Sequence, residues 1–89
     1  MSNLLKSNEF LENLIIGYFE ELRRWEDKNF GVDQPVRSKT WRINKHLASE
    51  GYTFSPVRVR RACERLRSRG VLQDDPKYSV SNCKSWKFR

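Results

Sequence analysis

Hydrophobic residues in the N-terminal part of the chain recur at helical spacing. Between residues 8 and 26, apolar side chains return every three or four positions, which is the period of one face of an α-helix. These positions are Leu11, Leu14, Ile15, Tyr18, Phe19, Leu22 and Trp25. Asn8 is suited to cap the start, and Arg23 and Arg24 suit the last turn. The pattern predicts an amphipathic helix over 8–26 that packs on a core.

The middle of the chain changes pattern twice. Residues 27–37 lack a helical period and contain Gly31 and Pro35, which indicates a loop in which residues 34–37 can form a very short strand. An imperfect apolar stripe then predicts a short helix over 38–50. The residues suited to cap its start are Ser38 and Thr40.

A third helix, over 55–69, has the clearest boundaries. Ser55 can cap the free N–H groups, and Pro56 is shaped for the first helical position. Gly70 suits the end. The apolar residues follow at helical spacing and form a narrow face. They are Val59, Ala62, Cys63 and Leu66.

The remaining residues, 71–89, predict a β-hairpin. A strand begins at Val71-Leu72, and apolar and polar residues alternate toward the C-terminus, as in half-buried strands. The alternating apolar positions are Tyr78, Val80, Trp86 and Phe88. The turn residues allow the tip of the hairpin at 74–77 or at 81–82.

Charge is distributed unevenly along the 89 residues, whose net charge is +7. Residues 1–37 carry five Lys/Arg and seven Asp/Glu, whereas residues 38–89 carry thirteen Lys/Arg and four Asp/Glu. A surface that binds a polyanion is therefore expected in the second part of the chain.

The third predicted helix concentrates this positive charge. Six arginines lie between Arg58 and Gly70, and arginine binds phosphate and guanine with a planar, two-pronged donor set. On a helical projection, the side opposite the apolar face carries Val57, Arg61, Glu64, Arg65 and Ser68, and the flanking positions are Arg58 and Arg60. This face matches the needs of a helix in the DNA major groove.

Residues 38–89, in the order helix, helix, hairpin, resemble the winged helix-turn-helix superfamily, and the run RRACERLRSRGVL over residues 60–72 carries most of the resemblance. The resemblance implies one α+β winged-helix domain over 1–89, with three helices and a C-terminal wing. In that fold the second helix of the pair (55–69) enters the major groove, and the wing follows the DNA backbone or enters the minor groove. The expected DNA-binding residues are Lys39, Ser55, Val57, Arg58, Arg60, Arg61, Arg65, Lys77 and Lys84. Lys39 would act with backbone amides after Ser38, at a helix N-terminus.

The function expected from these features is sequence-specific binding of double-stranded DNA, as a small transcriptional regulator or an accessory factor of a mobile element. Two alternatives stay open: a protein-interaction adaptor that docks through its basic surface, and an RNA-binding module. The acidic first helix is a candidate surface for homodimerisation or for a protein partner.

Other chemistry is not indicated. His46 is the single histidine, and Cys63 and Cys83 lack the paired spacing of zinc sites. We therefore expect no enzymatic activity, metal or cofactor. Neither a signal peptide nor a membrane span is evident, which favours a cytoplasmic protein. The three tryptophans, Trp25, Trp41 and Trp86, could stack on bases, but their apolar surroundings favour core packing.

Overall fold

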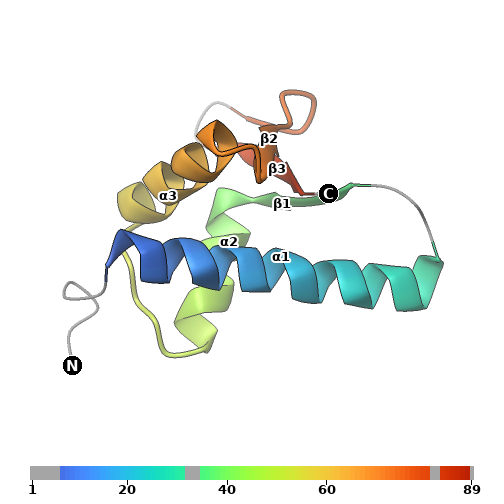
Figure 1. The fold of residues 1–89 in the computed structure, drawn as a ribbon, viewed down its shortest axis with the longest axis horizontal. Coiled ribbons are helices and arrows are strands. Elements are labelled where there is room, and N and C mark those ends of the chain that lie inside the picture. The colour runs from blue at the N-terminus through green and yellow to red at the C-terminus, as the bar shows by residue number, and fades with distance from the viewer. Residues whose placement is uncertain (1–6, 32–34, 81–82, 89) are drawn as a thin grey trace.

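The computed structural model of the protein describes residues 7–31, 35–80 and 83–88. Within these ranges the chain forms three helices and three strands (Figure 1). Their bounds are α1 Asn8–Phe30, β1 Val36–Lys39, α2 Thr40–Ser49, α3 Pro56–Ser68, β2 Leu72–Asp74 and β3 Ser85–Phe88. In Figure 1, α1 runs along the length of the molecule, and α3 lies near the first turns of α1. The last turns of α1 project beyond the other elements.

The first helix is longer than its apolar pattern predicts. Its N-cap is Ser7, whose hydroxyl accepts a hydrogen bond from Phe10 N at 3.0 Å, so the prediction that Asn8 caps the helix is wrong. The helix also continues past residue 26 to Phe30, because residues 27–30 contain no helix breaker. Gly31, in the left-handed conformation with φ 58°, ends the helix.

The first strand and the second helix begin later than predicted. β1 spans Val36–Lys39, and Ser38 is buried within it, where its hydroxyl lies 2.7 Å from Tyr18 Oη. Thr40 opens α2, but its hydroxyl donates to the carbonyl of Lys84 at 2.9 Å. Neither predicted cap is therefore used as one, because both hydroxyls bond to distant parts of the chain.

The third helix follows its prediction closely. α3 spans Pro56–Ser68, and the hydroxyl of Ser55 accepts from the amide of Arg58 at 3.2 Å. Gly70 follows with φ 81°, a backbone conformation that suits glycine. All four residues of the predicted apolar face are completely buried: Val59, Ala62, Cys63 and Leu66.

The three strands form one antiparallel sheet in the order β1-β3-β2. Trp86, at the centre, pairs with Ser38 of β1 on one side and with Asp74 of β2 on the other, and its side chain is fully buried. The predicted hairpin of β2 and β3 is confirmed. β1 comes from much earlier in the chain and connects the hairpin to the helices.

The connection between β2 and β3 differs from the predicted alternation. The chain turns directly after Asp75, since Pro76 has no N–H for a strand ladder, and Tyr78 N donates back to Asp75 O at 3.2 Å. Tyr78 and Val80 are exposed and lie outside the named strands, so their assignment to half-buried strands is wrong. This turn, at 75–78, overlaps the first predicted tip at 74–77. The alternative tip at 81–82 lies outside the described residues, but Val80 and Cys83, which flank it, exchange two backbone hydrogen bonds of 3.0 Å.

One hydrophobic cluster holds the described elements together. It joins buried residues of all three helices to the two strands of the hairpin, and its largest side chains include Trp86, Phe19, Leu11, Ile15 and Ile43. The fold is α+β, with an element order and sheet order compatible with the predicted winged helix. None of the described helices combines the length and the apolar character that crossing a bilayer requires.

Candidate nucleic-acid interface

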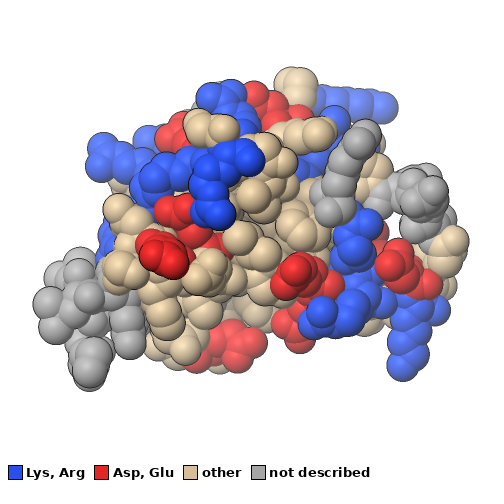
Figure 2. Space-filling view, in the orientation of Figure 1, with Lys and Arg blue, Asp and Glu red and all other residues tan. Residues whose placement is uncertain are grey.

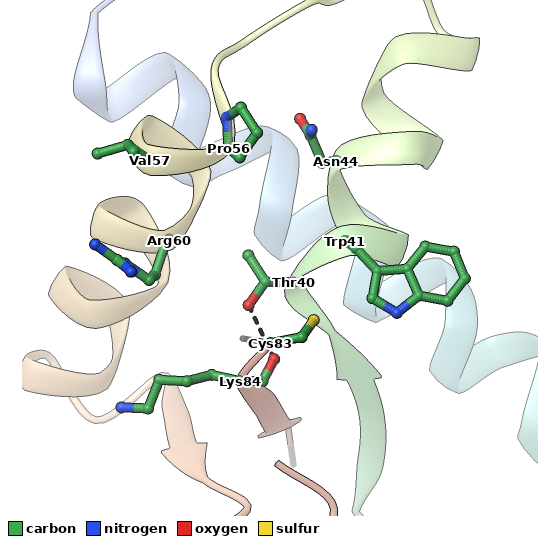
Figure 3. Close-up of a pocket in the computed structure, with 8 residues that line it drawn as sticks. All are labelled: Thr40, Trp41, Asn44, Pro56, Val57, Arg60, Cys83 and Lys84. Atoms are coloured by element: carbon green, nitrogen blue, oxygen red, sulfur yellow. Dashed lines mark hydrogen bonds between the residues drawn. The ribbon is translucent and has the colours of Figure 1, made fainter. Parts of the chain in front are cut away.

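A groove of about 180 Å³ lies where α2, α3 and the start of β3 meet (Figure 3). Thr40, Trp41 and Asn44 of α2 line one side, and Pro56, Val57 and Arg60 of α3 line the other. Cys83 and Lys84 line its remaining side. We call this feature the α2–α3 groove.

The α3 side of the groove carries an apolar side chain, Val57, and an arginine, Arg60. Val57 is 46% exposed on the first turn of the helix, although it is apolar. Arg60, one turn later, is exposed, and so is its neighbour Arg61. Among the residues that the structure describes, neither arginine side chain has an ion-pair or hydrogen-bond partner. Both guanidinium groups are thus available to an external acceptor.

Lys84 is positioned beside these groups by its own backbone. Its carbonyl accepts from the amide and the hydroxyl of Thr40, each at 2.9 Å, which ties the start of β3 to the start of α2. In Figure 3 the side chains of Lys84 and Arg60 extend to the same side of the groove. The ammonium lies 3.4 Å from Asp74 Oδ1 and 4.9 Å from the centre of the Trp86 ring.

Asp74 lowers the net charge of this region without removing its positive sign. Its carboxylate also accepts from Arg67 Nη1 at 2.7 Å. The hydrogen bond from Arg67, with the nearby charge of Lys84, holds the pKa of Asp74 below its ordinary value despite partial burial. One carboxylate thus lies between two cations, and each cation keeps partial exposure.

Two of the predicted DNA contacts on α3, Arg58 and Arg65, turn toward α1 instead. Arg65 Nε and Arg69 Nη1 each lie 2.8 Å from the carboxylate of Glu12, which is buried. The Arg58 guanidinium is 5.0 Å from the ring centre of Phe54, and it also donates to Asn8 Oδ1 at 3.4 Å. Arg58 and Arg65 are therefore engaged in contacts within the protein, while Arg60 and Arg61 face outward.

The paired carboxylate has a perturbed pKa. Burial alone would raise the pKa of Glu12, but the hydrogen bonds and charges of Arg65 and Arg69 outweigh burial and lower it. Sequence reasoning missed this contact, although Glu12 stands between Leu11 and Ile15 on the apolar side of the helix. A carboxylate on an apolar helix face is the signal that could have suggested a buried ion pair.

The other three predicted residues lie around the edges of this region. The Ser55 hydroxyl serves as the α3 cap. Lys39 is half-buried at the N-cap position of α2, and the next amide, of Thr40, already donates to Lys84 O. That amide is therefore not free for a phosphate, and the phosphate site predicted for Lys39 with the amides after Ser38 stays a prediction. Lys77 is exposed on the turn after β2, with its ammonium 5.6 Å from the Tyr78 ring centre.

Trp41 and Asn44 line the groove but were not predicted to belong to a site. Trp41 was expected in the core and is instead 49% exposed, and Trp25 is 55% exposed. Only Trp86 of the three is a core residue. The reason is the position of Trp41 two residues before the buried Ile43, which places it about 200° around the helix from the core side.

Positive and negative side chains gather over different elements of the fold. On the face shown in Figure 2, Lys and Arg side chains gather over α3, and Asp and Glu side chains lie beside and below them along α1. This separation follows the uneven charge of the sequence. A polyanion approaching α3 therefore meets positive charge, whereas the middle of α1 presents carboxylates.

Groups with other chemistry lie away from the groove. Glu21, His46 and Glu50 place ligand atoms within 4.8 Å of one another, and His46 Nε2 is 3.4 Å from Glu50 Oε1. They are the described residues that could hold a metal, although the two carboxylates are exposed.

Burial raises the pKa of the Cys63 thiol to about 12, so this side chain stays protonated and acts as a core residue.

Comparison of the chain with family models, with curated proteins and with solved structures finds no match.

Proposed function

We propose that this chain is a sequence-specific double-stranded DNA-binding protein of the winged-helix class. The observation that carries the proposal is the α2–α3 groove, where Val57 and Arg60 of α3 lie beside Lys84, the residue before β3. These three side chains come from the two elements that a winged helix presents to DNA. An α-helix also has the width that the major groove admits.

In this proposal the N-terminal half of α3 reads base edges. The exposed guanidinium groups of Arg60 and Arg61 can each donate two hydrogen bonds to a guanine, and the methyl groups of Val57 can contact a thymine methyl. Lys84 and Lys77 contact phosphates, which orients the domain but carries no sequence information directly.

The proposal gives Arg58 and Arg65 a role other than base contact. Because both bind groups of the protein itself, they orient α3 and contribute long-range attraction rather than base contacts. We propose that the protein acts in the cytoplasm as a small transcriptional regulator or as an accessory factor of a mobile element. A single domain contacts a short site, so high specificity needs a second copy or a partner on adjacent DNA.

One observation favours the alternative of a protein-interaction adaptor. Trp25 and Phe30 are 55% and 64% exposed near the end of α1, and their ring centres lie 5.6 Å apart. Exposed aromatic pairs are typical of protein interfaces. Such an interface on α1 is also compatible with DNA binding, because none of its residues lines the α2–α3 groove.

The test is fluorescence anisotropy with duplex DNA and duplex RNA over a salt series, followed by selection of preferred sites from a random duplex pool. The proposal predicts a preference for duplex DNA, a log–log salt slope of several units and an enriched sequence motif. Equal and weak binding to both duplexes, with no enriched motif, would favour the adaptor. A preference for duplex RNA would favour the RNA-binding alternative.

A further inference from the structure

A second hollow, of about 240 Å³, shares Trp41 with the α2–α3 groove. Its main side chains are two exposed aromatic residues, Trp41 of α2 and Tyr78 of the turn after β2. The cationic residues that line it are Arg37, Lys39 and Arg42. We call this feature the aromatic hollow.

The aromatic rings of the hollow are accompanied by cations. The guanidinium carbon of Arg42 is 5.3 Å from the Trp41 ring centre, and that of Arg37 is 5.0 Å from the Tyr78 ring centre. Lys77 approaches the Tyr78 ring from the same turn, at 5.6 Å. These distances are within the range of a cation–π interaction, so each flat ring lies beside a group that attracts phosphate.

The Tyr78 side of the hollow is firmly supported. Asp75 is 97% buried, and its carboxylate accepts from Ser85 Oγ at 3.1 Å and pairs with Arg37 Nε at 3.3 Å. The amide of Asp75 also donates to Ser85 O at 3.2 Å, and its carbonyl accepts from Tyr78 N at 3.2 Å. Asp75 therefore holds Arg37 through its carboxylate and the backbone of Tyr78 through its carbonyl.

The charge of the lining selects an anion. Asp and Glu are absent from the described residues that line the hollow, whereas three of them are Lys or Arg. Of those three, Arg37 is paired with a carboxylate, that of Asp75. A ligand that fits two exposed aromatic side chains and a positive lining carries both flat rings and negative charges, as a nucleotide chain does.

We propose that the aromatic hollow binds single-stranded DNA, with one unpaired base stacked on each aromatic ring and the phosphates near Lys39 and Arg42. Duplex DNA does not fit this role, because its bases stack on one another and leave no free faces. Trp41 lines both the hollow and the α2–α3 groove, and Figure 3 shows its ring on the opposite side of the groove from Arg60. A duplex on α3 can thus continue into the hollow as an unpaired strand.

The experiment measures binding of three DNA probes at one salt concentration: a blunt duplex, the same duplex with a thymidine overhang, and the overhang alone. The overhang is expected to raise affinity over the blunt duplex by about tenfold or more, and Trp41→Ala or Tyr78→Ala is expected to remove most of that gain. Blunt-duplex affinity should change little in Tyr78→Ala, because Tyr78 lines the aromatic hollow and not the α2–α3 groove. Trp25→Ala is the matched control, since Trp25 is similarly exposed but lies on α1.

Tryptophan fluorescence supplies a direct readout of stacking. In a Trp25→Phe variant the remaining tryptophans are Trp41 and the fully buried Trp86. Titration with a thymidine oligonucleotide is expected to quench the exposed Trp41 component. Circular dichroism and thermal melting confirm that each variant is folded.

The outcomes separate this inference from the proposed function. An overhang that adds no affinity, or an unquenched Trp41, overturns the aromatic hollow as a site and leaves duplex recognition by α3 untouched. If instead the overhang still adds affinity through Trp41 while Arg60→Ala leaves blunt-duplex binding unchanged, the inference stands and the proposed reading by α3 fails.

Discussion

Arg65 Nε lies 2.8 Å from Glu12 Oε2, and this ion pair joins α3 to α1. Arg69 Nη1 lies 2.8 Å from the other oxygen of the same carboxylate. The carboxylate is buried, whereas the two arginine side chains are 37% and 55% exposed. The orientation of α3, and with it the direction in which Val57 and Arg60 face, thus depends in part on a residue of the first helix.

Replacement of the buried carboxylate is expected to destabilise the fold. Glu12→Gln leaves Arg65 and Arg69 without their anionic partner, and we expect the free energy of unfolding to fall by about 2 kcal/mol, since the arginines keep access to water. Urea denaturation measures this change. The control is Glu9→Gln, which replaces an exposed first-turn carboxylate of the same helix. It should change the free energy of unfolding by less than about 0.5 kcal/mol. Equal stability of the two variants would contradict a structural role for the pair.

The same carboxylate makes stability depend on acid pH. The pKa values of Glu12 and Asp74 are lowered in the folded protein from ordinary values of 4.5 and 3.8, so the unfolded chain binds protons more readily than the folded one. Their contribution is complete above the unfolded pKa values and is lost as pH falls through the lowered ones. Denaturation from pH 7 to pH 2 should show stability falling below about pH 5. In Glu12→Gln the fall should be shallower, and an unchanged slope would count against this assignment.

The two groups of arginines on α3 should respond differently to substitution. Arg60→Ala or Arg61→Ala is expected to weaken binding to the selected duplex by about 1–3 kcal/mol, with little effect on stability, if each contacts a base. Arg65→Ala should chiefly lower the melting temperature. Anisotropy and thermal melting of the same samples separate the two effects. A larger loss of specific binding in folded Arg65→Ala than in Arg60→Ala would reverse the assigned roles.

Lys84→Ala should act on DNA binding without regard to sequence. Because a phosphate contact releases counterions but reads no base, we expect similar weakening for selected and random duplexes and a log–log salt slope reduced by about 1. Anisotropy over a salt series measures both. If only the selected duplex is weakened, Lys84 reads bases or shape instead of holding phosphate.

The two cysteines should differ in reactivity. Burial raises the pKa of Cys63 to about 12 and removes it from solvent, whereas Cys83 is partly exposed beside the groove. A thiol reagent at pH 8 is expected to modify Cys83 in the folded protein and Cys63 only after denaturation. Cys83→Ser should therefore abolish the reaction of the folded protein, and rapid labelling of that variant would show that Cys63 is accessible.

Local sequence signals predicted the third helix well. Ser55, Pro56 and Gly70 are capping and breaking residues that act on the adjacent backbone, so their effect does not depend on distant contacts. The apolar face of the same helix was also predicted, because Val59 and Leu66 must be buried for any amphipathic helix of this pattern to pack. The hairpin of β2 and β3 was predicted from the alternation of apolar and polar residues toward the C-terminus, which includes Trp86.

Long-range partners account for the errors. Ser38 and Thr40 have the chemistry of helix caps, but the first bonds to Tyr18 and the second to Lys84, from segments that the local sequence does not specify. Trp41 was assigned to the core on its apolar surroundings, but it lies about 200° around α2 from the buried Ile43 and is exposed. The hydroxyls of Ser38 and Thr40 can bond to several kinds of partner, and only the assembled fold brings Tyr18 and Lys84 next to them.

The sequence by itself determined the α+β class, the three helices, the hairpin and the concentration of positive charge on α3, because these depend on periodicity and local backbone chemistry. Tertiary structure alone decided which of the arginines are available. Helical periodicity places Arg60 and Arg65 about 140° apart on α3, but it does not say which side meets an anion. In the assembled fold the buried carboxylate of Glu12 pairs with Arg65, and no equivalent anion lies beside Arg60 among the described residues. Electrostatic pairing across 53 positions of sequence separates them, since the attraction acts through space and not along the chain.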